Sequence, residues 1–291
     1  MSKKHPVVAV TGSSGAGTTT VKRAFEHIFF RDGIKPAVVE GDSFHRYTRS
    51  EMRVKMADEH MSHFGPAANR FDKLAELFST YGATGSGQKR YYLHSPEEAA
   101  EHNTRLGVDK EPGEFTPWED IETGTDLLFY EGLHGLVVTE EDNVAQHVDL
   151  GVGVVPIVNL EWIQKIFRDN AERGYSEEAI VDTILRRMPD YILHITPQFS
   201  RTDINFQRVP TVDTSNPFIA RDIPTPDESF VVIRFKDPRK FNTDFPHLLA
   251  MLEGSFMSRR NSIVVPGGKM SFAMEIIFGP IIHQMMEQRG A

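Results

Sequence analysis

The sequence predicts an α/β fold in which a mixed, mostly parallel β-sheet is flanked by helices. Three observations carry this prediction. The run Val7–Val10 leads through a glycine-rich turn into an amphipathic segment, and further apolar runs at 36–40 and 126–132 finish beside acidic residues. Short apolar runs without alternation are typical of strands buried on both faces, as parallel strands are.

The turn after the first strand has the composition of a phosphate-binding loop. Gly12 and Gly17 stand five positions apart, and glycine allows both a tight turn and a close approach by a ligand. Apolar residues at helical spacing predict a helix from about Thr18, whose first N–H groups and partial positive charge would face a phosphate. The loop residues expected to hold the phosphates are Gly12, Ser13, Ser14, Gly15, Ala16, Gly17, Thr18, Thr19 and Thr20.

This loop departs from the usual pattern at one position. Phosphate loops of this kind carry a lysine and then a serine or threonine after the second glycine. Here Thr18 occupies the lysine position, while Thr19 fills the position of the Mg²⁺ ligand. If the loop serves phosphoryl transfer, another segment must supply the missing cation. The alternative is a glycine-rich turn that binds no ligand.

Composition narrows the function classes. The chain has 291 residues, with 32 Lys and Arg against 41 Asp and Glu, so its net charge of −9 argues against nonspecific binding to nucleic acid or to an anionic membrane. It contains no cysteine, which excludes disulfides and thiol-based control. No run approaches the ~18 apolar residues of a membrane span. We expect a cytoplasmic protein with one domain over 1–291, because no linker or repeat divides it.

The second strand, at 36–40, ends at a cluster of charged residues. Asp42, His45 and Arg49 follow it within a few positions. Functional groups of parallel α/β sheets gather at the carboxyl ends of strands, so this cluster is a candidate site. The alternative is that Asp42 caps a helix and the arginines lie on a solvated surface. The polar, basic stretch that follows, as far as His63, suits a mobile substrate-binding element better than a core helix.

The middle of the chain predicts a helix, an excursion and a third strand. Apolar residues at helical spacing over 71–81 indicate a helix that ends near Gly82, and the Gly-, Pro- and charge-rich stretch 83–121 is expected to leave the sheet, for example as a hairpin. The strand at 126–132 carries Glu131 at its end, where nucleotide-binding folds hold Mg²⁺. A further strand is expected over 152–160, where Pro156 indicates either a kink or an edge position.

Two helices are expected after this strand, over about 161–188. On the first, over 161–174, Lys165 and Arg168 lie on one face, and Arg173 stands at the end. Taken alone, these residues would be a solvated face stabilised by ion pairs four residues apart. The missing lysine of the phosphate loop favours a functional role for them instead. The second helix is expected over 176–188, ended by Pro189.

The remaining elements are assigned by short apolar runs. Strands are expected at 191–195, 230–235 and 262–265, with a loop-rich stretch over 196–226. The apolar tail 270–286 is interrupted by Pro280 and is either core or a subunit contact.

The order of these motifs resembles that of the phosphoribulokinases. The resemblance rests on the phosphate loop, on Gly41-Asp42-Ser43-Phe44-His45, on Tyr130-Glu131-Gly132 and on the stretch from Lys165 to Gly174, and it runs almost end to end. It is with the bacterial type, which shares the phosphate-loop (P-loop) kinase fold of nucleoside and nucleotide kinases. The resemblance implies transfer of the γ-phosphoryl of ATP to O1 of ribulose 5-phosphate, a step of the Calvin cycle.

The resemblance also implies roles for individual residues. It implies a general base at Asp42, an acid at Glu131, and contacts from His45 and Arg49 to the sugar phosphate. The resemblance places Lys165, Arg168 and Arg173 on a lid, at about 161–188, that closes over the phosphates. Thr19 and Glu131 are then the candidate Mg²⁺ ligands, with Asp169 as a further metal or orienting group. The resemblance further implies NADH activation, AMP inhibition and a homo-oligomer, and no residue pattern locates an effector site.

The chemistry of phosphoryl transfer agrees with these roles. A transition-state arginine supplies ~10³–10⁵ in rate, which Thr18 cannot supply and Arg168 or Arg173 can. Two rivals remain. If the protein were a nucleoside kinase of the uridine type, the basic cluster after Asp42 would be unexplained, because a nucleoside carries no phosphate. A non-catalytic nucleotide-binding regulator would need neither a base nor a cationic lid.

Overall fold

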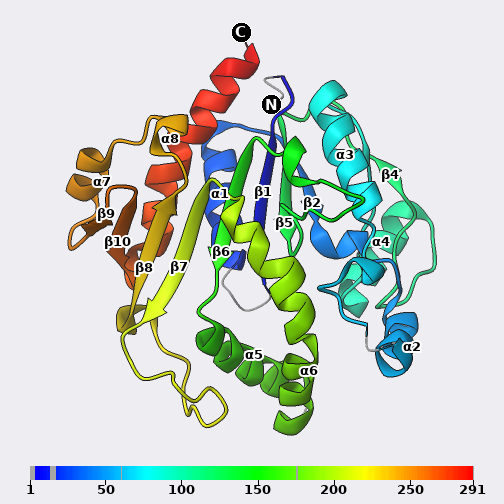
Figure 1. Ribbon diagram of the computed structural model, residues 1–291. Coiled ribbons are helices and arrows are strands. Elements are labelled where there is room, and N and C mark those ends of the chain that lie inside the picture. Colours follow the sequence, from blue (N-terminus) through cyan, green and yellow to red (C-terminus); the bar gives the residue numbers. More distant parts are fainter. Residues whose placement is uncertain (1–3, 14–17, 60, 175, 291) are drawn as a thin grey trace.

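The computed structural model describes residues 4–13, 18–59, 61–174 and 176–290, without the side chains of residues 18, 19, 59, 172, 173 and 290 (Figure 1). Within these residues an eight-stranded sheet has the order β2-β5-β1-β6-β7-β8-β10-β9, and β3 and β4 form a separate small sheet. The strands are β1 (Val7–Gly12), β2 (Pro36–Glu40), β3 (Gln88–Lys89), β4 (Glu119–Asp120), β5 (Leu127–Gly132), β6 (Leu150–Val155), β7 (Ile204–Pro210), β8 (Ser229–Phe235), β9 (Phe256–Arg259) and β10 (Ser262–Pro266).

Helices cover both faces of the sheet (Figure 1). They are α1 (Thr18–Asp32), α2 (Arg49–Glu59), α3 (Phe71–Thr84), α4 (Pro96–Leu106), α5 (Val158–Arg173), α6 (Glu177–Asp190), α7 (Phe245–Met251) and α8 (Met270–Gly290). Strands β2, β5, β1, β6 and β7 run parallel, and β8, β10 and β9 continue the sheet in antiparallel fashion. The predicted mixed, mostly parallel sheet flanked by helices is therefore confirmed.

The central strand β1 is buried on both faces, as its uninterrupted apolar run predicted. Val8 and Val10 belong to the core cluster that contains α1 and α8, whereas Val7 and Ala9 belong to the cluster that contains α3. The stacked rings of Phe25 on α1 and Phe278 on α8, 4.6 Å between centroids, show that the C-terminal tail is core. Pro280 lies within α8 without ending it.

The structure corrects two predicted strands. The expected strand at 152–160 ends at Val155, and the residues from Val158 already belong to α5. The expected strand at 191–195 is a π-helical turn that continues α6 past Pro189. Tyr191 and Ile195 are buried, whereas Ile192 and Leu193 between them are exposed, so the short apolar run belongs to a helix with one buried side.

Three further elements differ from the expectation. β7 lies inside the stretch expected to be loop-rich. α3 extends two residues past Gly82 and ends at Gly85, whose left-handed φ of 73° suits a helix C-terminus. The polar stretch after Arg49 forms the helix α2, most of whose side chains are exposed or half-buried. Among the described residues, no helix is both long and apolar enough to cross a membrane.

Candidate active site

The phosphate loop follows the central strand at the carboxyl edge of the parallel sheet. β1 ends at Gly12 between β5 and β6, Ser13 is buried, and α1 begins at Thr18. Positions 14–17 and the side chains of Thr18 and Thr19 lie outside the described residues. The strand and the helix that flank the loop lie where the sequence placed them, so N–H groups at the start of α1 point toward this edge.

The neighbouring strands β2 and β5 touch at this edge through two glycines. A Cβ atom on Gly132 would lie 2.7 Å from Gly41 Cα, and one on Gly41 would lie 2.9 Å from Gly132 Cα. Only glycine allows this approach, because real Cβ contacts are never so short. The turn Gly41–Phe44, which carries Asp42, is thereby held against the end of β5, where Glu131 stands.

Two histidines contact the carboxylate of Asp42. His45 Nε2 lies 3.2 Å from Oδ1, and His94 Nε2 lies 3.6 Å from Oδ2. Desolvation by the surrounding protein would raise the pKa of Asp42, but the hydrogen bond from His45 and the charges of the nearby histidines outweigh it and hold this pKa well below its usual range. The side chain remains 40% exposed. Asp42 is therefore an ionised carboxylate that a ligand can reach.

The structure brings Arg49 to the same cluster. Its Nη2 donates to the carbonyl of His94 at 3.1 Å, and its guanidinium lies 5.9 Å from the centre of the Tyr92 ring. Its backbone N–H donates to Gly113 O at 2.8 Å, and a Cβ on Gly113, whose φ is 97°, would lie 2.6 Å from Arg49 Cβ. The start of α2 is thus attached to the excursion after residue 83.

Sequence reasoning missed the contribution of this excursion. His94 reaches Asp42, and Arg90 donates through Nε to Ser43 O at 2.8 Å and through Nη2 to His45 O at 2.6 Å. Arg90 also stacks 3.7 Å from the centre of the Phe115 ring, and burial lowers its pKa to about 10. Neither residue stands in a motif. Arg90 clamps the backbone of the turn that carries Asp42 and His45.

The predicted lid cations are joined to one buried acid. Lys165 hydrogen bonds to Asp169 Oδ2, and Arg168 Nη2 lies 3.0 Å from Asp169 Oδ1. Asp169 is only 3% exposed. Burial lowers the pKa of Lys165, while Asp169 acts against this shift. The side chain of Arg173 lies outside the described residues. Lys165, Arg168 and Asp169 therefore form one charged cluster on α5.

Helices α5 and α6 meet near Ser13, the last described residue at the start of the phosphate loop. The Tyr191 hydroxyl donates to Glu161 Oε2 at 3.1 Å, and this contact ties the start of α5 to the turn after α6. Burial raises the pKa of Glu161, an effect that the nearby hydroxyls of Ser13 and Tyr191 partly offset. Arg187 on α6 lies close enough to lower the pKa of both Lys165 and His63. This part of α5 and α6 thus lies close to Ser13 and to the Asp42 cluster.

Glu131 stands where the strand-end argument placed it. In the sheet register it lies opposite Val10 of β1 on one side and Glu40 of β2 on the other. Lys22 on α1 donates to Glu40 Oε1 at 2.9 Å, and although burial lowers its pKa, Glu40 and then Glu131 raise it overall. Lys22 is therefore a cation at this edge that the motif analysis missed. Among the described residues, no group of three or more metal-ligating side chains is present.

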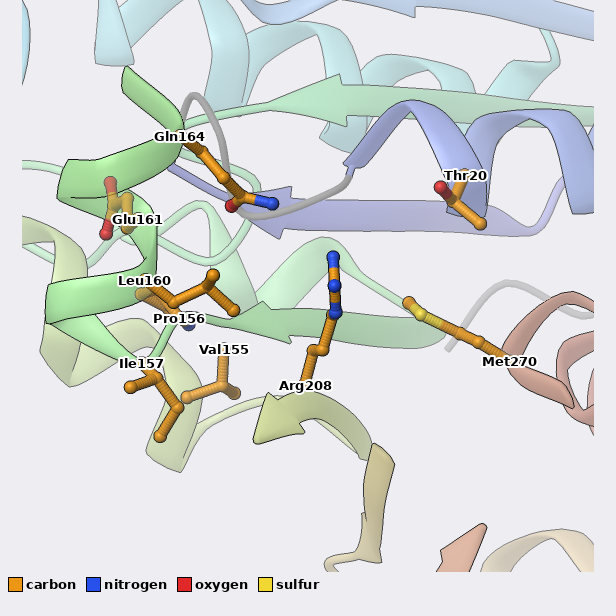
Figure 2. A pocket seen from close by; sticks show the side chains of 9 residues that line it. All are labelled: Thr20, Val155, Pro156, Ile157, Leu160, Glu161, Gln164, Arg208 and Met270. Atoms are coloured by element: carbon orange, nitrogen blue, oxygen red, sulfur yellow. The ribbon is translucent and has the colours of Figure 1, made fainter. Parts of the chain in front are cut away.

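A pocket opens beside the first turn of α1, between β6, β7, α5 and α8 (Figure 2). Figure 2 shows Gln164 and Arg208 extending from α5 and β7 into the space between them. Arg208 is held by its Nε–H, which donates to Ser229 Oγ at 2.9 Å. The pocket is lined by Thr20, Val155, Pro156, Ile157, Leu160, Glu161, Gln164, Arg208 and Met270. Its walls are mainly apolar, with an amide and a guanidinium among them.

Comparisons with known proteins agree with this geometry. The family model described as phosphoribulokinase / uridine kinase matches residues 7–215. The chromosomal phosphoribulokinase of Cupriavidus necator is 60% identical over 99% of this chain and 98% of that protein, and the phosphoribulokinase of Xanthobacter flavus is 63% identical over 99% of both. The solved structure of phosphoribulokinase from Rhodobacter spheroides covers 100% of both chains with a TM-score of 0.88 and 52% identity. The chain belongs to the phosphoribulokinase / uridine kinase family, and within it to the phosphoribulokinases.

Proposed function

We propose that the protein transfers the γ-phosphoryl group of ATP to O1 of ribulose 5-phosphate, giving ribulose 1,5-bisphosphate and ADP for the Calvin cycle. The observation that carries this proposal is the Asp42 cluster, in which a reachable, ionised carboxylate lies beside His45, His94 and the Arg49 contact. A sugar phosphate needs both a proton acceptor for its hydroxyl and cations for its phosphate. The cluster offers both at one strand end.

Asp42 is the proposed general base. As O1 bonds to the γ-phosphorus, its hydroxyl becomes more acidic, and a carboxylate of low basicity can accept the proton in the transition state. Arg49 is the proposed ligand of the substrate phosphate. His45, which the resemblance assigns to the same role, has both ring nitrogens engaged, Nδ1 with Asn69 and Nε2 with Asp42, so it is proposed to orient Asp42 beside the bound sugar phosphate. The excursion at 83–121 contacts both residues: Arg90 donates to the carbonyl of His45, and Arg49 donates to the carbonyl of His94.

The phosphate loop, residues 12–20, is the proposed site of the ATP phosphates, and the pocket beside Thr20 would take the adenine base. Ile157, Leu160 and Met270 offer apolar surface for a flat ring, and the Gln164 amide can both donate and accept at its edge.

A Mg²⁺ ion is the proposed cofactor. Glu131 offers the carboxylate oxygens that Mg²⁺ prefers, and Thr19 would add a hydroxyl. The substrate phosphates would supply the other ligands. Bound there, the ion would neutralise charge on the β- and γ-phosphates. Both oxygens of Asp169 are occupied by Lys165 and Arg168, which supports an orienting role for Asp169 over a metal-ligand role.

Lys165, Arg168 and Arg173 are the proposed source of the cation that Thr18 does not supply. Lys165 and Arg168 are pre-positioned by a shared acid, so they reach the phosphates as a unit when the lid at about 161–188 closes. We also propose NADH as an activator, AMP as an inhibitor, a homo-oligomeric assembly and a cytoplasmic location, all supported by the family resemblance.

One assay tests the substrate and the subclass together. ADP release from Mg·ATP is measured with ribulose 5-phosphate, with uridine and with no acceptor, each with and without NADH. We expect turnover only with the sugar phosphate, increased by NADH. Turnover with uridine would identify a nucleoside kinase, and ATP binding without turnover under all conditions would identify a regulator.

A further inference from the structure

A buried amide that no motif marks lies behind the Asp42 cluster. Asn69 is 2% exposed and stands between the turn Pro66–Ala68 and α3. Its Nδ2 donates to His63 O at 2.9 Å and to Gly65 O at 2.7 Å. Both partners are backbone carbonyls, which only accept hydrogen bonds. The orientation of the amide is therefore fixed by chemistry, and Asn69 Oδ1 must point away from these carbonyls.

The Asn69 oxygen points at His45. Oδ1 lies 2.9 Å from His45 Nδ1, and because an amide oxygen can only accept, Nδ1 must carry a hydrogen. A neutral imidazole has one N–H, so a neutral His45 would present the lone pair of Nε2 to Asp42 Oδ1, 3.2 Å away. Two lone pairs at this distance repel each other. The contact requires a second proton between Nε2 and Oδ1.

We propose that Asn69 is a positioning residue that keeps a hydrogen on His45 Nδ1. A second proton is then shared between His45 Nε2 and Asp42 Oδ1. Only the other oxygen of Asp42, Oδ2, takes the proton of the substrate hydroxyl. The proposal rests on the proposed function, because that function makes Asp42 the base. In the transfer, the O1–H bond breaks as the O1–P bond forms, and the proton passes to Oδ2. The bond between the γ-phosphorus and its bridging oxygen breaks, and its electron pair leaves with ADP.

The neighbouring ring of His63 does not compete for the proton shared by His45 and Asp42. The ring of His63 stacks on His45 with 4.3 Å between centroids. Burial, followed by the charges of His45 and Arg187, lowers the pKa of His63 to about 3, so His63 is neutral. The titratable and charged groups facing His45 from the packed elements are Asp42, His63, Arg90, Tyr92, His94 and His134.

The loop that supplies the carbonyls to Asn69 packs against the end of α6. Ser62 Oγ donates to Asp190 Oδ2 at 2.6 Å, and a Cβ on Gly65 would lie 2.9 Å from the same oxygen. The end of α6 therefore packs directly on the loop that supplies these carbonyls to Asn69. Both N–H bonds of the amide are thus directed at backbone that is packed against α6, and the amide oxygen faces His45.

A direct test measures the ring nitrogens of His45 in the native protein. Solid-state ¹⁵N spectra of protein labelled in its histidine rings are recorded at neutral pH, and the H45N variant identifies the His45 signals. We expect His45 Nδ1 to be protonated. A His45 ring with an unprotonated Nδ1 would overturn the proposal, whatever the activity of the protein.

A kinetic test uses N69A, H45N and the double variant. We expect N69A to lower kcat roughly ten- to a hundredfold, the effect of losing one buried hydrogen bond to an orienting group, with the KM for ATP unchanged. The acid limb of the kcat profile should move to higher pH, because a released His45 no longer stabilises the ionised form of Asp42. Since Asn69 acts through His45, the double variant should have the same kcat as H45N alone.

The control is N261A, which removes a partly buried amide that donates to Phe235 O at 2.7 Å in the antiparallel part of the sheet. Its kcat and pH profile should equal those of the unaltered protein. Independent, multiplicative losses in the double variant, or an N69A profile with an unmoved acid limb, would show a merely structural role. Inactivity of the unaltered protein toward ribulose 5-phosphate would instead refute the proposed function, and the ¹⁵N spectra would still decide the state of His45.

Discussion

His94 Nε2 lies 3.6 Å from Asp42 Oδ2, the oxygen opposite to the one that His45 contacts. The two histidines come from different parts of the chain: His45 ends the turn after β2, and His94 stands in the excursion just before α4. The same His94 offers its carbonyl to Arg49. The excursion is therefore part of the proposed site, because it touches both the base and a proposed phosphate ligand.

We predict that H94N makes Asp42 easier to protonate. The charge of His94 helps to lower the pKa of Asp42, so its loss should raise that pKa and move the acid limb of kcat to higher pH. We expect kcat at neutral pH to be nearly unchanged, because His45 still keeps Asp42 ionised there. Initial rates across pH check this prediction. An acid limb that stays in place would show that His94 does not act on the base.

We predict that D42N nearly abolishes turnover. Removal of a general base costs ~10²–10⁴ in rate, and asparagine keeps the shape of the side chain without its basicity. ATP binding should be nearly unchanged, because Asp42 does not belong to the phosphate loop. Single-turnover assays and equilibrium titration with ATP check the two halves separately. Parallel loss of catalysis and of ATP affinity would refute the role of base.

We predict that R49A weakens the binding of the sugar phosphate far more than the binding of ATP. A charge-assisted hydrogen bond to a phosphate contributes about 1.5–3 kcal/mol, so the KM for ribulose 5-phosphate should rise roughly ten- to a hundredfold. The matched control is R53A, one turn along α2 at an exposed position. It should leave both KM values unchanged. Equal increases in the two variants would mean that the general positive charge of α2, and not Arg49, attracts the substrate.

The strand-end acids could be located from the sequence because the signal is local. A short buried run followed by Gly and Asp, as at Glu40 to Asp42, predicts a parallel strand and the place where it stops. Parallel strands end at one edge of a sheet, so Asp42, Glu131 and the phosphate loop were expected together. The cations of α5 were found because helical spacing placed Lys165 and Arg168 on one face.

The rest of the site could not be found this way, because it depends on contacts between distant segments. His94 and Asn69 stand in polar stretches without periodicity, and only the packing of the excursion and of the loop before α3 brings them to Asp42 and His45. The strand expected at 191–195 failed for a related reason. A five-residue apolar run does not distinguish a strand from one side of a helix.

We predict that acid destabilises the fold partly through His134. This ring is 4% exposed, with Nε2 3.0 Å from His63 O, so Nε2 carries the hydrogen. Nδ1 has no hydrogen-bond partner among the described residues and lies in a ring that packs on Phe71. Burial lowers the pKa of His134 to about 3, although the hydrogen bond to His63 O acts against this shift.

The sign of the effect follows from where the proton binds. The pKa of histidine in the unfolded chain is about 6.5. Below this pH the unfolded state therefore binds a proton that the folded state does not bind. The contribution of His134 to stability is thus complete above pH 6.5 and is lost as the pH falls toward 3. Between pH 7 and pH 5 the loss should be about 2 kcal/mol, at ~1.4 kcal/mol per pH unit below pH 6.5.

The variant H134Q separates this effect from general acid sensitivity, because glutamine keeps an N–H donor for His63 O and does not titrate. Urea unfolding at pH 7, 6 and 5 should show that H134Q loses about 2 kcal/mol less than the unaltered protein over this range. The control H247Q, at an exposed position on α7, should lose as much as the unaltered protein. If H134Q and the unaltered protein lose the same free energy of unfolding between pH 7 and pH 5, His134 binds its proton in both states, and the buried neutral ring is the wrong description.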